Sequence, residues 1–330
     1  MRILVTGATG FLGKALSMRL LSAGHEVTTL GRNASILAQL EAKGARSIQV
    51  DLADENMIRA ACQNQETVFH CGALSSPWGK FQAFHQSNVT GTRNVIRGCK
   101  SAKVNRLVFV STPSIYFHYD SRINVKEDAP LPPRQVNAYT QTKLIAEGQI
   151  DEAFKSGLAV ITLRPRALFG PGDTSILPRL IDRLEHNRLP IIGDGKNIID
   201  LTYIDNLVDA LVLCMHSPQS TLGKKYNITN GEPIFLWEII RKLCGELGLL
   251  FPRRHIPYPL ADAAAALLEG IYQLIPGQPE PPLTRYTVSV VAKNATLDIS
   301  AARKELGFTP NVSVEEGFTR FIRSWKEAHR

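Results

Sequence analysis

Cysteine is scarce in this chain, and its spacing carries no pattern. The 330 residues include five cysteines, at positions 62, 71, 99, 214 and 244, and no Cys-x-x-Cys pair. An odd number of unpaired cysteines indicates neither a disulfide framework nor a zinc knuckle. Free thiols are typical of a reducing compartment, so we expect a cytoplasmic protein and assign no metal ligands.

Long apolar runs are also missing. The most apolar segment, residues 255–275, carries Asp262 and Glu269. Its uninterrupted part is shorter than the roughly 18 to 20 residues that a spanning helix needs. We expect a packed helix of a smaller lobe there, with a substrate lid or an interfacial helix in peripheral contact with a membrane as alternatives. The first residues already have the pattern of a strand, which leaves no apolar stretch for a signal peptide.

Charge is not concentrated in any segment. Lysine and arginine total 38 against 30 acidic residues, a net charge of +8, but the basic residues are scattered. A nucleic-acid partner is therefore not expected. The length and the 44% hydrophobic content suit one large domain or two interleaved ones, without repeats or low-complexity segments.

The chain does have a glycine-rich turn at its start. An apolar run at residues 3–5 is typical of a buried strand, and Gly7, Gly10 and Gly13 follow it before a helical pattern. Glycines allow close approach of the backbone to a ligand, and a helix start favours phosphate. The first gap is one residue wider than in the Gly-x-Gly-x-x-Gly fingerprint, so a plain turn between strand and helix is the alternative.

Strand patterns alternate with helical ones through the first half of the chain. After the first strand, they lie at residues 25–30, 47–50, 67–70, 106–111 and 159–163. This alternation predicts an α/β fold with a Rossmann-type doubly wound parallel sheet, joined by right-handed crossovers. A polar, proline-containing loop is expected at residues 117–136.

The pattern becomes irregular after residue 170. We assign residues 1–170 to the dinucleotide-binding domain, with returning segments at about 194–230. Residues 171–193 and 231–330 are assigned to a smaller substrate lobe. Residues 198–213 and 225–229 are the candidates for returning to the sheet.

Tyr139 and Lys143 stand four residues apart, on one face of a helix expected over residues 139–154. A free tyrosine has a pKa of about 10, and a neighbouring ammonium stabilises its phenolate, so the pair suits proton transfer. Such a pair also arises by chance, and the interpretation depends on its combination with the glycine turn and the alternating strands.

Several segments together resemble the extended short-chain dehydrogenases/reductases, over nearly the whole chain. They are Thr6 to Gly13, Asp51-Leu52, Asn88 to Thr92, Ser111 to Tyr116, Tyr139 to Lys143, Arg164 to Gly172 and a C-terminal signature at 298–310. The order and spacing of these motifs carry the resemblance.

The resemblance implies a catalytic set of Thr112, Tyr139 and Lys143. Tyr139 would act as general acid or base at the substrate oxygen, and Lys143 would hold the nicotinamide ribose and lower the tyrosine pKa. Thr112 would hydrogen-bond the same oxygen, with Ser111 and Ser114 as less favoured substitutes. A hydroxyl that only caps the backbone is the alternative for Thr112.

The resemblance also implies which residues bind the dinucleotide. The set is Gly7, Thr9, Gly10, Phe11, Leu12, Gly13, Arg32, Asp51, Leu52, Tyr139, Lys143 and Pro165. The second strand ends at Gly31-Arg32 without the carboxylate that NAD enzymes use, and an arginine suits a 2′-phosphate, so NADP(H) is favoured over NAD(H). A solvated Arg32 and an ordinary strand-end turn at 51–52 are the alternatives. Asn88 resembles the family's structural or proton-relay asparagine, and we expect the structural role.

Departures from the family pattern indicate which subfamily of enzymes the chain resembles. Pro113-Ser114 stand where nucleotide-sugar dehydratases carry Asp-Glu, and the segment 164–169 lacks the asparagine of sugar-nucleotide epimerases. Other segments are similar to 3β-hydroxysteroid dehydrogenases and bacterial 2-alkyl-3-oxoalkanoate reductases. They are residues 202–206, 230–233, 237–238 and 281–285.

We therefore expect an NADP(H)-dependent reductase or dehydrogenase that acts on a lipid-like 3-oxo or 3-hydroxy acid or a sterol-type substrate. The family resemblance suggests a homodimer. Arg166 and Arg285 are candidates to bind a substrate carboxylate, with a structural or solvated arginine as the alternative for each. A nucleotide-sugar epimerase or reductase is the second hypothesis. A non-catalytic NAD(P)-sensing protein is the third, and the intact Tyr139–Lys143 pair argues against it.

Overall fold

The computed structural model describes residues 1–329, and a parallel sheet forms its centre. The seven strands are β1 (Arg2–Thr6), β2 (Glu26–Gly31), β3 (Arg46–Gln49), β4 (Thr67–His70), β5 (Arg106–Val110), β7 (Val160–Pro165) and β12 (Lys225–Ile228). Their order is β12-β7-β5-β4-β1-β2-β3, and every pairing is parallel. The order reverses between β1 and β4, which is where open α/β sheets bind ligands. The Rossmann-type prediction is confirmed.

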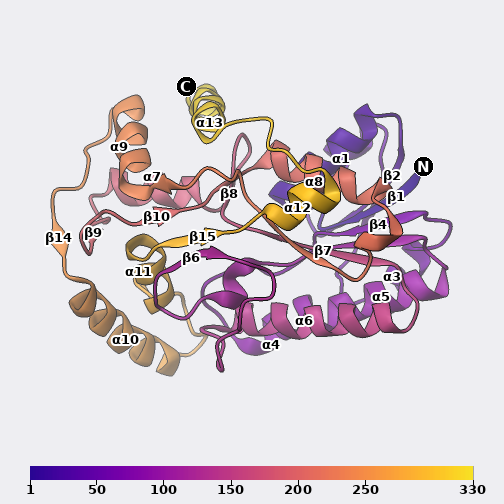
Figure 1. Cartoon of the computed structure of the whole chain (residues 1–330), viewed down its shortest axis with the longest axis horizontal. Helices are drawn as coiled ribbons and strands as arrows, with labels where there is room; N and C mark the ends of the chain where they lie inside the picture. The colour runs from indigo at the N-terminus through magenta and orange to yellow at the C-terminus, as the bar shows by residue number, and fades with distance from the viewer. Residues whose placement is uncertain (330) are drawn as a thin grey trace.

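Helices cover both faces of this sheet because successive strand residues point to opposite sides. Ile3 and Val5 of β1 pack into one core, and Leu4 packs into the other. The first face is covered by α1 (Phe11–Ser22), α2 (Ala34–Glu41), α8 (Ile204–His216) and α12 (Ser300–Leu306). The second is covered by α3 (Glu55–Ala61), α5 (Gly91–Ser101) and α6 (Ala138–Lys155). Figure 1 shows these layers above and below the strands, at the end where the N-terminus lies.

Three short helical segments complete the layers around the sheet. They are α4 (Phe81–Phe84), the π-helix η1 (His85–Thr90) and the 3-10 turn η3 (Gln219–Thr221). The π-helix continues directly into α5, and it holds Asn88 in a buried position.

A smaller lobe lies at the other end of the molecule (Figure 1). Its four-stranded sheet has the order β13 (Ile234–Phe235), β10 (Ile198–Ile199), β15 (Ala295–Leu297), β6 (Arg122–Val125). Its helices are α7 (Leu177–Glu185), α9 (Leu236–Leu247), α10 (Tyr258–Leu274), α11 (Arg285–Ala292) and α13 (Val314–Ala328). Two short parallel pairs join β8 (Leu168–Phe169) to β11 (Thr202–Tyr203) and β9 (Ile191–Ile192) to β14 (His255–Ile256).

The structure differs from two sequence expectations about local elements. Residues 225–228 do return to the main sheet as β12, but residues 198–213 do not: β10 belongs to the second sheet, and α8 covers the main one. The segment 117–136, expected as a loop, contains β6, because β15 pairs with it from far along the chain. Residues 299–308 pack into the core of the main sheet, although the sequence division places them in the lobe. The division into two lobes stays a prediction.

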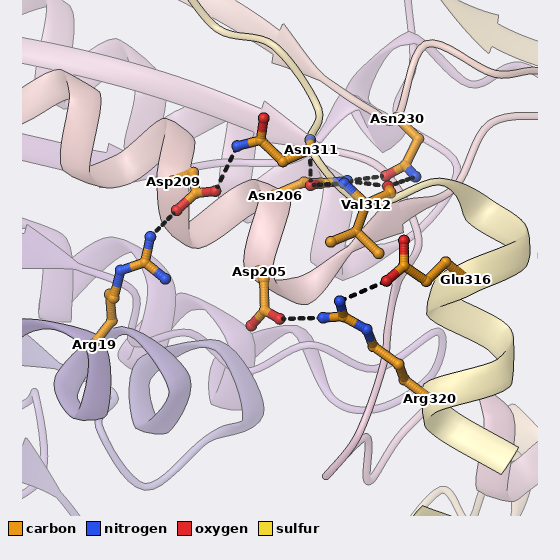
Figure 2. Close-up of polar contacts among 9 residues, drawn as sticks. All are labelled: Arg19, Asp205, Asn206, Asp209, Asn230, Asn311, Val312, Glu316 and Arg320. Carbon is orange, nitrogen blue, oxygen red and sulfur yellow. Dashed lines mark hydrogen bonds and ion pairs between the residues drawn. The ribbon is translucent and has the colours of Figure 1, made fainter. Parts of the chain in front are cut away.

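Asn206 ties the C-terminal segment to α8. Its amide donates to the carbonyl of Val312 and to the Asn230 side chain, and its carbonyl oxygen accepts from the backbone of Asn311 and Val312. Figure 2 shows this group beside the ion pair that joins Arg320 of α13 to Asp205 of α8. The motif residues at 202–206 and 230–233 therefore have a structural task in this chain.

The helix α10 is packed on one side only. Ala261 and Ala265 are buried against α11, while Leu267 and Leu274 face water, the latter 85% exposed. Within residues 1–329, no helix combines the length and apolar character needed to cross a bilayer.

Candidate functional site

Two of the turn glycines are required by close packing. Gly7 has a φ of +67°, and a Cβ there would lie 2.5 Å from the Cα of Gly72. A Cβ at Gly13 would lie 2.2 Å from the carbonyl oxygen of Gly7. The turn after β1 therefore lies directly against the residues that follow β4, at the position where the strand order reverses.

Gly10 has a different environment from the other two. It is exposed, and the nearest atom to a Cβ placed there is the Gly7 oxygen at 3.3 Å. Gly10 is the N-cap of α1 and offers no capping side chain. The first-turn amides and the positive end of the helix dipole are thus open to an anion, which fits the pyrophosphate of a dinucleotide. Phe11 and Leu12 begin α1 partly buried.

Residues predicted at the adenosine end gather beside this turn. Thr9 fills the space beneath Gly31, where a Cβ would lie 2.3 Å from the threonine methyl. Arg32 follows with its side chain 72% exposed, and its ion pair is a loose 3.5 Å contact with Asp51. Leu52 packs beneath the residues that follow β4. No carboxylate ends β2.

The phenol of Tyr139 lies in the first turn of α6, which a capping box between Asn137 and Thr140 starts. Thr112, at the end of β5, and Ser75, after β4, both approach the phenol and favour its ionised form. Burial has the larger effect and raises the pKa of Tyr139. The phenol therefore stays protonated at neutral pH.

The ammonium of Lys143 is directed to the end of β5. It is buried, donates to the Val110 carbonyl at 2.6 Å and lies over the Phe109 ring. Burial lowers the pKa of Lys143 to about 8. The lowering of the Tyr139 pKa by Lys143 stays a prediction.

Asn88 has the structural role expected for it. Its side chain bonds both backbone groups of Leu74, at 2.7 and 3.1 Å, and the hydroxyl of Thr142 at 3.0 Å. It thereby fixes the loop that carries Ser75 against α6.

Thr112 also caps the 3-10 turn η2 (Pro113–Tyr116). Its oxygen accepts the Ser114 amide at 3.1 Å, so its own proton is free to be donated toward the phenol and substrate. Ser114 in turn bonds Tyr286 of α11 at 3.1 Å between their hydroxyls. The sequence did not identify Ser75 or Tyr286, although Ser75 follows a strand end at the predicted binding edge.

The two candidate arginines have separate environments. Arg285 forms a two-pronged ion pair with Asp262, at 2.9 and 3.0 Å, and lies over the Tyr119 ring, so its role is structural. Arg166 follows Pro165, the last residue of β7, and its Nε is buried without a partner.

Comparison with known proteins agrees with this geometry. Residues 3–229 match the model of the NAD dependent epimerase/dehydratase family. The chain is 37% identical to 2-alkyl-3-oxoalkanoate reductase from Stenotrophomonas maltophilia, over 97% of this chain and 98% of that protein. It is 30% identical to human sterol-4-alpha-carboxylate 3-dehydrogenase, decarboxylating, over 100% and 89% of the two chains.

A solved structure gives the same fold. UDP-glucuronic acid 4-epimerase from Bacillus cereus, in complex with NAD, superposes with a TM-score of 0.79 at 24% identity, covering 100% of both chains. At that identity the likeness concerns the fold alone. Taken with the family match and the two relatives, the glycine turn, the sheet order and the Tyr139 helix show that the chain belongs to the NAD dependent epimerase/dehydratase family, the extended short-chain dehydrogenases/reductases.

Proposed function

We propose that this protein is an NADP(H)-dependent reductase or dehydrogenase that interconverts a ketone and a secondary alcohol on a lipid-like 3-oxo or 3-hydroxy acid. The observation that carries the proposal is the convergence of Thr112 and Ser75 on the partly buried phenol of Tyr139. The catalytic and cofactor-binding assignments made from the sequence are part of the proposal.

Tyr139 supplies the proton in the reducing direction. Because burial raises its pKa, the phenol is protonated at neutral pH and is ready to act as a general acid on a carbonyl oxygen. Thr112 donates a hydrogen bond to the same oxygen, since its own acceptor site is filled by the Ser114 amide. Together the two hydroxyls stabilise the negative charge that develops on that oxygen.

The nicotinamide supplies the hydride that a carbonyl carbon accepts or an alcohol carbon loses. Lys143 has one N–H held by the Val110 carbonyl at 2.6 Å, and two further N–H groups remain for the ribose hydroxyls. The preference for NADP(H) is supported by the exposed Arg32 and by the absence of a carboxylate at the end of β2.

The substrate class is supported by the relatives and by the residues beside the phenol. Two relatives act, by their names, on a 2-alkyl-3-oxoalkanoate and on a sterol-4-alpha-carboxylate. Tyr286 packs edge-on against Phe117 at 5.2 Å, which gives the lobe side of the site an aromatic wall. Pro113-Ser114 provide no acid or base for dehydration.

The test replaces Tyr139 by Phe. We expect Tyr139→Phe to lose about 10² to 10⁴ in kcat with a 3-oxo acid, while NADPH titration by fluorescence remains as in the wild type. Tyr272→Phe on α10 is the matched control and should keep wild-type turnover. Wild-type turnover in Tyr139→Phe contradicts the assigned role.

A nucleotide-sugar enzyme remains the second candidate because the fold is shared with UDP-glucuronic acid 4-epimerase. Calorimetric titration with UDP and UDP-glucuronic acid separates the two. We expect no UDP binding, and binding would favour the sugar enzyme. Absence of NADPH and NADH oxidation with 3-oxo acids, keto-steroids and UDP-sugars would favour a non-catalytic sensor.

A further inference from the structure

Arg166 is a partly buried cation without a counterion in contact. Its Nε is inaccessible to solvent and has no hydrogen-bond partner among residues 1–329. Within the same residues, no carboxylate lies within 4.0 Å of its guanidinium. Burial lowers the pKa of Arg166, and the charge of Asp200 offsets this effect only in part. A desolvated guanidinium nitrogen is costly unless a ligand pairs with it.

The charge of Asp200 acts on Arg166 but does not pair with it. Asp200 is 1% exposed, and one of its oxygens accepts the Leu297 amide at 2.7 Å. Its other oxygen has no partner within the described chain, just as Nε of Arg166 has none. Each group favours the charged form of the other, yet residues 1–329 include no hydrogen bond or ion pair between them.

Arg166 lies at the same edge of the sheet as the catalytic hydroxyl of Thr112. The strands β5 and β7 are paired neighbours, so Thr112 and Arg166 follow them at the same edge of the sheet. Tyr286 of α11 raises the pKa of both Arg166 and Tyr139, and its hydroxyl bonds that of Ser114 at 3.1 Å. Arg166 is thus the cation next to the position that the proposed function gives to the carbonyl.

We propose that Arg166 binds the carboxylate of the substrate, so that the enzyme selects the free 3-oxo acid over its ester and over a simple ketone. This inference rests on the proposed function. In a 3-oxo acid one carbon separates the carboxylate from the carbonyl, so both groups are held by one compact site. A guanidinium pairs with a carboxylate through two parallel hydrogen bonds, which also orients the carbonyl toward Tyr139 and Thr112. Arg285 is not available for this, since Asp262 occupies it.

The test compares 3-oxododecanoate with its methyl ester by NADPH oxidation. We expect the wild type to show a KM for the acid about ten- to hundredfold below that for the ester. Arg166→Gln should raise the KM for the acid by a similar factor and bring the acid-to-ester ratio near one. Arg166→Lys, which keeps the charge but loses the two-pronged geometry, should keep part of the preference.

Arg179→Gln is the matched control, because Arg179 is a solvent-facing arginine of α7 that pairs with Glu280. It should keep the wild-type ratio. Equal KM values for acid and ester in the wild type, or an unchanged ratio in Arg166→Gln, overturn the inference and leave the proposed function standing. No reduction of either compound by the wild type defeats the proposed function instead. If Arg166→Gln fails to fold by circular dichroism, the wild-type ratio and Arg166→Lys decide.

Discussion

Arg164 and Arg166 flank Pro165 at the end of one strand, and they have opposite surroundings. Arg164 is fully satisfied: it pairs with Glu147 at 2.9 and 2.5 Å and also bonds the Tyr116 hydroxyl. Arg166 has no such partner within residues 1–329. Arg164 belongs to β7 and pairs with Glu147 of α6, whereas Arg166 lies just beyond the last residue of that strand.

The difference distinguishes an arginine that stabilises the fold from one that is available to bind a ligand. A buried guanidinium whose three nitrogens are all hydrogen-bonded holds elements together, here α6, β7 and the turn η2. A buried charge with free donors weakens the fold and is retained where a ligand completes it. The same contrast holds between Arg285, which Asp262 occupies, and Arg166. Three substitutions test this comparison.

Breaking the buried ion pair between Arg164 and Glu147 should have the largest effect on stability. Arg164→Met leaves Glu147 as an unpaired buried carboxylate and should lower the free energy of unfolding by about 3–5 kcal/mol. Urea titration measures it. The control Arg97→Met removes an exposed ion pair with Glu55 and should change stability by less than about 1 kcal/mol. Similar losses in the two variants would show that Arg164 is not specially paired.

Neutralising Asp200, whose charge acts on Arg166, should have an intermediate, pH-dependent effect on stability. Burial raises the pKa of Asp200 from 3.8 to about 6. Between these values the folded state holds a proton that the unfolded state lacks, so this group's contribution to stability falls as pH rises. Asp200→Asn removes the free-energy cost of ionising this buried carboxyl group. Its stability should exceed that of the wild type by about 1–3 kcal/mol at pH 7, and the gap should close toward pH 4. A gap independent of pH contradicts the assignment.

Removing the unpaired cation should have the smallest effect, with the opposite sign to Arg164. Arg166→Met deletes a desolvated charge that has no counterion in contact. The free energy of unfolding, measured by thermal denaturation, should therefore fall by less than about 1 kcal/mol or rise. A loss as large as that of Arg164→Met would show that Arg166 is a structural residue and would end the comparison.

Most of the fold could be predicted from the sequence, because its signals are local. The apolar run at 3–5, the glycines that follow it and the alternating strands specify the parallel sheet without long-range information. The glycine turn could be located for the same reason. The spacing of Gly7 and Gly13 indicates a tight turn, and in the structure both positions make backbone contacts too close for a side chain. The strand β6 was missed because its partner β15 comes about 170 residues later in the chain.

The membership of the site stays a prediction, and the sequence did not predict the contacts around its residues. The helical spacing places Tyr139 and Lys143 on one face, but it does not say that the Val110 carbonyl takes the ammonium. Ser75 and Tyr286 come from a loop and from the distant helix α11, and only folding brings them to the phenol. Likewise, the pattern treated Arg166 and Arg285 alike, and the contact with Asp262 distinguishes them.

The strand β12 has a consequence for how the molecule is made. The first six strands of the sheet are complete by Pro165, yet the seventh is supplied by residues 225–228 and is covered by α12 near the end of the chain. During synthesis, β7 leaves the ribosome with one edge unpaired, and this edge stays exposed until β12 and α12 have also been synthesised. A fragment ending near residue 170 would therefore expose that edge and tend to aggregate, so the sheet matures only with the full-length polypeptide.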